Sequence, residues 1–184
     1  MTNYAIENEL RPNLGSDEKL IWTGRPKTGI VFRSSDALLI PFSLLWGGFA
    51  VFWETSVIET GAPLLFKLWG IPFVLVGLYI TVGRFFVDAK KRANTIYGIT
   101  PDRIIIKTGI FSREIKSLNI RTLTDITINE KDDKSGTITF GPTDIRTTMM
   151  QGMEWPGANQ PPRLEFINDA RNVYKQIIEL QRQR

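Results

Sequence analysis

The chain has 184 residues, a net charge of +4, and neither cysteine nor histidine. These two absences exclude thiolate nucleophiles, imidazole bases, disulfides and the usual zinc sites, and with them much of enzyme chemistry. The length accommodates one ordinary domain, or a membrane segment with a domain of about 100 residues. The modest positive charge suits an anionic partner, either a phospholipid surface or nucleic acid.

Residues 1–36 precede the first long apolar run and carry charges of both signs. They lack the apolar core of a secretory signal peptide, so the first apolar run is expected to stay in the membrane. We predict that this stretch is a cytoplasmic N-terminal segment.

Two uncharged apolar runs follow, at residues 37–53 and 68–83. Each is slightly shorter than the ~20 residues that cross a bilayer core of ~30 Å, and flanking apolar residues close the gap. We predict a two-helix transmembrane hairpin over residues 37–86, with an external loop at 54–63. Buried helices of a soluble protein, or a re-entrant hairpin, are the alternatives, but the chain has little polar sequence to cover two such helices.

Lysine and arginine flank the hairpin on one side only. The loop at 54–63 contains two glutamates and no basic residue, whereas the two outer flanks hold Lys19, Arg25, Lys27, Arg33, Arg84, Lys90, Lys91 and Arg92. Basic residues stay on the cytoplasmic side of a membrane. The sequence therefore predicts an inner-membrane protein with both termini in the cytoplasm.

Small residues lie four apart in each predicted span. Ser43 and Gly47 stand in the first helix, and Gly77 and Thr81 in the second. Small residues let helix backbones approach closely in lipid, where hydrophobic attraction between helices is weak. Because the helices run antiparallel, we expect the two pairs to face each other.

Residues 87–184 change to short β-branched runs separated by turn residues. Strands are predicted at residues 95–100, 103–108, 110–118, 123–129, 137–140 and 163–167. Asn168 suits a helix N-cap, and the apolar residues of 169–182 recur at helical spacing. We predict an antiparallel meander with a C-terminal helix at 169–182 that packs on the sheet.

An irregular stretch at residues 142–162 interrupts this pattern. It contains Met149, Met150, Met153 and Trp155. Long loops are often functional and methionine adapts to contact surfaces, so these residues are candidates for a partner-binding loop. A flap over one end of the sheet is the alternative.

Several segments together resemble a known family. The runs are YGIT at residues 97–100, RII at 103–105, Gly109, SGTI at 135–138 and, before the hairpin, DEKLIWTGRP at 17–26. Their order resembles the bacterial pleckstrin-homology-like (PH-like) domain of small bacterial membrane proteins. The resemblance implies an α+β fold, with a strongly bent antiparallel sheet of about seven strands capped by the C-terminal helix. Residues 19–23 would then supply the first strand.

The leading functional hypothesis is a non-enzymatic module that mediates protein interaction or self-assembly at the inner membrane surface. Headgroup binding to anionic phospholipid is the alternative, although topology alone also explains basic flanks. Its candidate contacts are Lys90, Lys91, Arg92, Arg113 and Lys116. A subunit of an oligomeric channel or transporter is a third hypothesis.

No catalytic residue, metal site, cofactor or small-molecule substrate is predicted. The acidic residues Glu130, Asp132 and Asp133 fall in what should be a solvated turn, whereas acid–base catalysis requires a partly desolvated site. No helix-turn-helix pattern precedes the last helix, so nucleic acid is not an expected partner.

Overall fold

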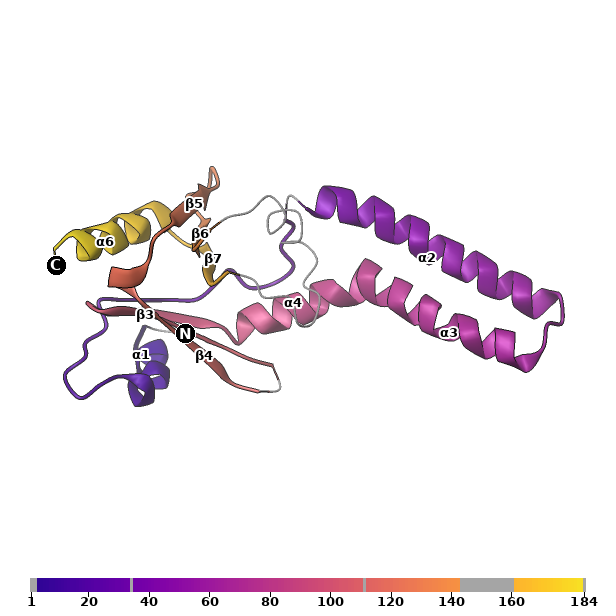
Figure 1. The fold of residues 1–184 in the computed structure, drawn as a ribbon, viewed down its shortest axis with the longest axis horizontal. Coiled ribbons are helices and arrows are strands. Elements are labelled where there is room, and N and C mark those ends of the chain that lie inside the picture. Colours follow the sequence, from indigo (N-terminus) through magenta and orange to yellow (C-terminus); the bar gives the residue numbers. More distant parts are fainter. Residues whose placement is uncertain (1–2, 34, 111, 143–160, 184) are drawn as a thin grey trace.

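The computed structural model describes residues 3–33, 35–110, 112–142 and 161–183. Two long helices extend side by side from one end of a β-rich domain (Figure 1). The first is α2 (Asp36–Glu59). The second is continuous over 30 residues and consists of α3 (Leu64–Leu78), the π-helical segment η2 (Tyr79–Gly83) and α4 (Arg84–Ala93).

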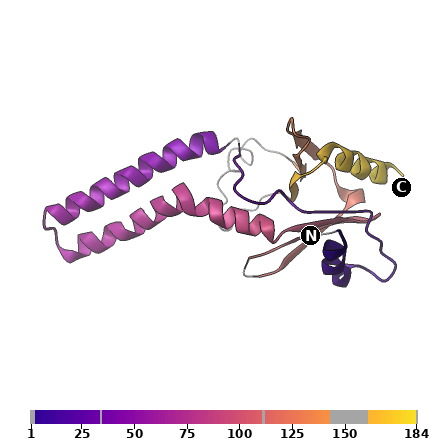
Figure 2. The ribbon, with the colours of Figure 1, turned by 180° about the vertical axis from the view of Figure 1, so that it is seen from behind.

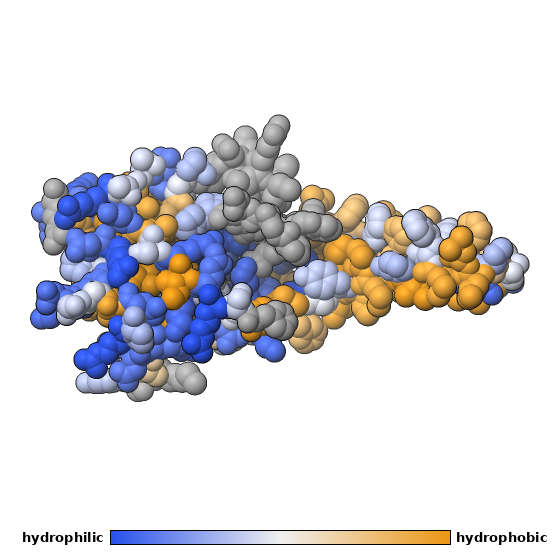
Figure 3. Space-filling model, turned by 60° about the horizontal axis from the view of Figure 1, so that its bottom comes forward, coloured by the Kyte–Doolittle hydropathy of each residue, from blue (hydrophilic) through white to orange (hydrophobic). Residues whose placement is uncertain are grey.

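Both helices are long and apolar enough to cross a membrane. Large apolar side chains such as Phe49, Phe52, Leu65 and Leu75 remain exposed on them. Figure 3 shows this as an apolar half of the molecule beside a largely hydrophilic β domain. The second helix continues to Ala93, beyond the predicted end of the hairpin at residue 86, and the first strand after it, β2, begins at Ile96.

Within the described residues, seven strands form two antiparallel sheets. Sheet A contains β1 (Trp22–Gly24), β2 (Ile96–Ile99), β3 (Arg103–Thr108) and β4 (Glu114–Asn119) in that order. Sheet B contains β5 (Ile126–Glu130), β6 (Gly136–Phe140) and β7 (Arg163–Ile167). The sheets meet where the Lys27 N–H, just after β1, donates to the Phe166 carbonyl of β7 at 3.0 Å.

The main core lies between the two sheets and α6 (Ala170–Arg182). Val173 and Ile177 of α6 are buried against Ile138 and Phe140 of β6. The end of α6 is held by Gln181, whose side-chain amide donates to the carbonyls flanking the short helix η3 (Ile120–Thr122), at 3.3 Å for Ile120 and 2.7 Å for Leu123. Figure 2 shows α6 and α1 on opposite sides of the β domain. The predicted α+β fold with antiparallel sheets and a C-terminal helix is confirmed.

Several predicted boundaries differ from the structure: the strand predicted at 123–129 is Ile126–Glu130, and the one predicted at 19–23 is Trp22–Gly24. The strand predicted at 110–118 begins only at Glu114, because a tight turn follows Gly109; a Cβ on Gly109 would lie 1.9 Å from the Ser112 carbonyl oxygen. Asn168 is not the N-cap of α6. That position belongs to Asp169 in a left-handed conformation (φ 52°) without a side-chain cap, while the Ala170 N–H donates to the Lys134 carbonyl at 3.2 Å.

The N-terminal segment contains structure that the sequence did not predict. The helix α1 (Asn3–Leu10) and the one-turn helix η1 (Arg11–Asn13) precede β1. Ile6 and Leu10 are buried against Ile96 and Ile105, on the face of sheet A opposite the main core. We call this the outer face of sheet A, and it is therefore covered by the chain's own N-terminus.

Candidate functional site

The four small residues predicted between the helices lie at one crossing of α2 with the second helix. The Thr81 hydroxyl is 3.3 Å from the Ser43 carbonyl oxygen and 2.8 Å from that of Gly77. A Cβ on Gly77 would lie 3.0 Å from the Gly47 Cα. Glycine at both positions allows this approach, in keeping with the way small residues pack helices in lipid.

Buried charges connect the helices to the β domain. The Arg33 guanidinium, in the segment before α2, lies 3.1 Å from the Asp88 carboxylate of α4 and 3.2 Å from the Glu165 carboxylate of β7. All three side chains are at most 14 % exposed. We call Arg33, Asp88, Arg92 and Glu165 the junction network. It joins three segments that are distant in the sequence.

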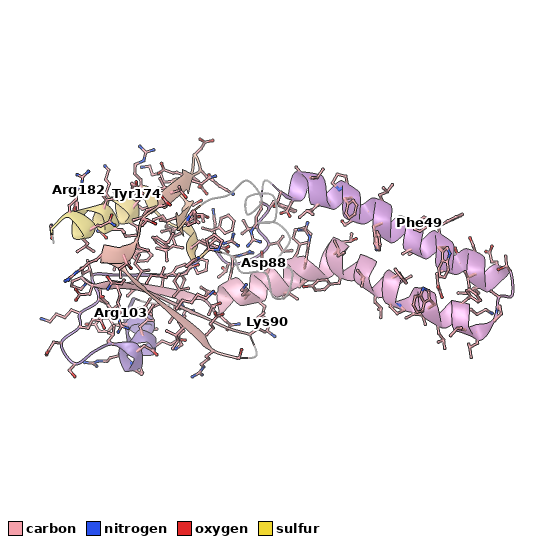
Figure 4. All side chains as sticks on the ribbon, viewed as in Figure 1. Phe49, Asp88, Lys90, Arg103, Tyr174 and Arg182 are labelled. Atoms are coloured by element: carbon pink, nitrogen blue, oxygen red, sulfur yellow. The ribbon has the colours of Figure 1, made fainter. Side chains whose placement is uncertain are left out.

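Arg92 is the most buried member of this network, with 2 % of its surface exposed. Its guanidinium pairs with Asp88 and donates to the backbone carbonyls of Gly29 (2.6 Å) and Lys27 (3.3 Å). Figure 4 shows Asp88 on the side of α4 that faces this junction. Arg92 therefore cannot present its charge to a lipid headgroup, and the prediction that placed it at the membrane surface does not fit the structure.

Tyr97 and Phe166 complete the junction on the sheet side. The Glu165 N–H donates to the Tyr97 hydroxyl at 3.0 Å, and burial raises the pKa of Tyr97 above its ordinary value. The guanidinium carbons of Arg33 and Arg92 lie 6.0 and 5.7 Å from the centre of the Phe166 ring. Such cation–π distances add to the attraction between the network and β7.

The other four basic residues predicted at a lipid surface are exposed. Lys90 and Lys91 lie near the end of α4, and Arg113 and Lys116 lie at or after the β3–β4 turn. A hydrogen bond of 2.7 Å between the Thr95 and Thr108 hydroxyls holds the end of β3 beside the end of α4. In Figure 4, Lys90 projects from the side of α4 away from Asp88. The structure thus brings these side chains to the end of the β domain nearest the helices.

Met149, Met150, Met153 and Trp155 lie outside the residues that the structure describes. Among the residues that it does describe, no three acidic side chains come together in a metal-binding group.

The outer face of sheet A forms a second candidate site, which the sequence did not reveal. Its floor consists of Ile96, Gly98 and Ile105, and Leu10 and Leu20 pack on it. A Cβ on Gly98 would come within 2.8 Å of both leucine side chains. The missing side chain at Gly98 therefore creates the space in which α1 and the following segment lie.

Basic side chains border this floor and pair with acidic residues of the N-terminal segment. Arg25 and Lys107 each lie 3.2 Å from the Glu9 carboxylate. Arg103 lies 2.6 Å from the Glu18 carboxylate and donates to the Asn13 carbonyl at 2.9 Å. The Arg103 hydrogen bond is the main cause that lowers the pKa of Glu18 to about 2.

The cover is incomplete on the β4 side. Ile115 of β4 pairs with Lys107 of β3, and cross-strand partners share a face of the sheet, so Ile115 belongs to the same outer face as Ile105. Its side chain is 47 % exposed. One exposed apolar side chain, beside the basic side chain of Lys107, thus lies on this face beyond α1.

The sequence comparison gives the family. The family model described as "Bacterial PH domain" matches residues 37–181. The chain belongs to the bacterial PH domain family. A similar solved structure is that of a DUF1696 family protein with a pleckstrin-homology domain from Shewanella loihica PV-4, with a TM-score of 0.42, 10 % identity and 98 % of each chain covered. Among curated proteins, none matches this sequence.

The match to the bacterial PH domain begins at the first residue after Asp36, so α1 and β1 lie outside it. The i, i+4 pair Ile6 and Leu10 was the only local sign of an amphipathic helix there. The junction network was also missed, because Arg33 is 55 residues from Asp88 and 132 residues from Glu165.

Proposed function

We propose that this bacterial PH domain protein is a non-enzymatic, membrane-anchored module that interacts with other proteins at the inner membrane surface. The observation that carries the proposal is the pairing of two apolar helices with a β domain that is fixed to them by buried charges. An anchor that holds a domain in one orientation serves recognition at a surface. Self-assembly of the same module is included in this proposal.

The composition of the helices supports anchoring. A pair of helices in a soluble protein would bury most of its apolar surface, whereas only 22 % of the most apolar window of α2 and 11 % of that of the second helix are buried. The loop between them has no lysine or arginine, while Lys90 and Lys91 follow at the β-domain side. The positive-inside rule then favours a cytoplasmic β domain.

The absence of native cysteine permits a direct test in intact cells. A single cysteine at Thr60, between the helices, should react with a membrane-impermeant maleimide from outside. A cysteine at Lys175, exposed on α6, should react only after lysis. The reverse pattern would overturn the orientation, and release of the protein by alkaline carbonate would overturn anchoring.

Contact with anionic phospholipid is a second candidate function. It is favoured by the position of Lys90, Lys91, Arg113 and Lys116 at the end of the β domain nearest the helices. Each basic residue close to an anionic surface contributes about 1 kcal/mol. Native mass spectrometry of full-length protein in micelles containing phosphatidylglycerol should show retained lipid that decreases in the Lys90→Gln/Lys91→Gln variant. The matched Lys175→Gln variant should retain lipid as the wild type does, and equal retention by all three would exclude this site.

A further inference from the structure

We propose that the outer face of sheet A is a docking groove for an acidic amphipathic helix of a partner protein, and that α1 occupies this groove until the partner displaces it. The inference deepens the proposed interaction function, on which it rests, by naming the surface and the chemistry of the partner.

The shape of the groove suits a helix. Gly98 lies in β2 between two strands, and an added Cβ there would strike the side chains of Leu10 and Leu20. Ile96 and Ile105 flank it with apolar side chains. A helix with apolar residues four apart fills such a floor, as Ile6 and Leu10 do now.

The basic residues around the groove indicate that the polar face of the partner helix is acidic. Arg25, Arg103 and Lys107 border the floor, and their carboxylate partners are Glu9 and Glu18. Residues 3–18 contain four acidic residues and one basic residue. The resident segment is therefore itself an acidic amphipathic ligand. A partner helix of the same pattern would satisfy the same three cations, and a basic helix would be repelled.

The resident helix is replaceable. It has eight residues, whereas helices shorter than about 12–15 residues are marginal without tertiary contacts. Two of its side chains are buried, and the Glu9 carboxylate that anchors it is 46 % exposed. Solvent at Glu9 weakens its ion pairs with Arg25 and Lys107. The better-buried Arg103–Glu18 pair lies beyond the end of α1 and does not hold the helix itself.

The resident helix leaves one apolar side chain of this face uncovered. Ile115 lies on the same face and is 47 % exposed, next to the basic side chain of Lys107. A longer partner helix would cover Ile115 as well as the floor. This additional contact would allow it to compete with a segment that is covalently attached.

The test uses full-length protein in detergent and a fluorescent peptide with the sequence of residues 2–20, measured by anisotropy. In the chain, Ile6→Asp/Leu10→Asp frees the groove, and this variant should bind the peptide. Wild type should bind it at least about tenfold more weakly, because the attached α1 competes at high effective concentration. In a second variant, Glu9→Lys/Glu18→Lys, the new lysines are repelled by the basic residues around the groove. This variant should also release α1 and bind the peptide. A peptide carrying Ile6→Asp/Leu10→Asp should not bind.

Adding Gly98→Leu to the freed chain fills the floor and should abolish binding. Equal binding with and without Gly98→Leu would overturn the proposal, as would no binding by either freed variant when near-ultraviolet circular dichroism shows an intact β domain. A dimer of wild type that forms with rising concentration and is lost in Ile6→Asp/Leu10→Asp would assign the groove to a second copy and overturn the partner. Peptide binding in detergent is independent of membrane orientation, so maleimide labelling and this assay fail separately.

Discussion

In the part of the chain that the structure describes, two contacts of the β domain with the rest of the chain differ in how far their charged side chains are exposed to water. At the junction network, Arg33, Asp88, Arg92 and Glu165 are almost fully withdrawn from water and contact one another from three segments. At the outer face of sheet A, the Glu9 carboxylate that pairs with Arg25 and Lys107 is 46 % exposed, whereas the Glu18 carboxylate that pairs with Arg103, beyond the end of α1, is 13 % exposed. Withdrawn charges penalise any separation of the parts, whereas exposed pairs permit exchange. The comparison suggests one permanent and one replaceable contact.

The largest expected effect is at the junction. Asp88→Ala leaves Arg33 and Arg92 buried without this carboxylate, and loss of one partner of a buried pair costs about 3–5 kcal/mol. Chemical unfolding of the full-length protein in detergent, followed by tryptophan fluorescence, measures the change. Lys175→Ala on the exposed face of α6 is the control and should have little effect. A loss below about 1 kcal/mol at Asp88 would remove the distinction between the two interfaces.

The crossing of the two helices is close-packed but uncharged, so a substitution there measures the effect of packing without any effect of charge. Gly77→Leu should force the two helices apart and destabilise them by roughly 1–3 kcal/mol, since overpacking strains a close contact. Gly48→Leu is the matched control, because a Cβ there meets nothing within 4 Å. Thermal unfolding in detergent compares the two variants, and equal melting temperatures would mean that the crossing tolerates separation.

At the replaceable interface, Leu10→Ala should release α1 while changing the global free energy of unfolding by roughly 1 kcal/mol or less, since local opening precedes global unfolding. Proteolysis by Lys-C should then cleave after Lys19 faster than in wild type, with the same unfolding midpoint. If Leu10→Ala instead shifts the midpoint as far as Asp88→Ala does, α1 is an integral part of the core.

Acid should produce the smallest and most local effect. The pKa of Glu18 is about 2 in the folded chain, below its ordinary value of 4.5. The contact with Arg103 therefore stabilises the N-terminal segment above pH 4.5, and this contribution is lost as the pH falls from 4.5 towards 2. The protection of backbone amides in residues 3–18, measured as the hydrogen-exchange rate relative to the intrinsic rate at the same pH, should decrease over that range. Glu18→Gln should show faster exchange already at pH 7 and a flatter response to acid.

The two interfaces also differ in how far the sequence predicts them. The strands at Arg103–Thr108 and Arg163–Ile167 were predicted to the residue, because β-branched or alternating apolar runs are bounded there by turn residues. The α1 helix was missed because two aliphatic side chains, Ile6 and Leu10, are too few for a periodic signal. Its place depends on Gly98, far away in the chain, whose missing side chain has meaning only once β2 is folded.

The ion pairs were even harder to predict from the sequence than α1. Lys90, Lys91 and Arg92 form one basic run in the sequence, yet the first two are exposed and the third is buried against Asp88. Helical geometry separates neighbouring residues onto different faces, but which face meets the β domain depends on the fold of residues 27–33 and of β7. Local sequence therefore predicted the elements well and their contacts poorly.

The π-helical segment η2 has a consequence for how the β domain is aimed. A π turn accommodates about one residue more than an α-helical turn, so every side chain after it is out of phase by about 100° with those before it. Gly77, which contacts α2, and Asp88, which pairs with Arg33, therefore point in directions that are set independently along one continuous helix. Removing a single residue from Tyr79–Gly83 would leave both ends of the second helix helical but rotate the β domain about the helix axis relative to α3.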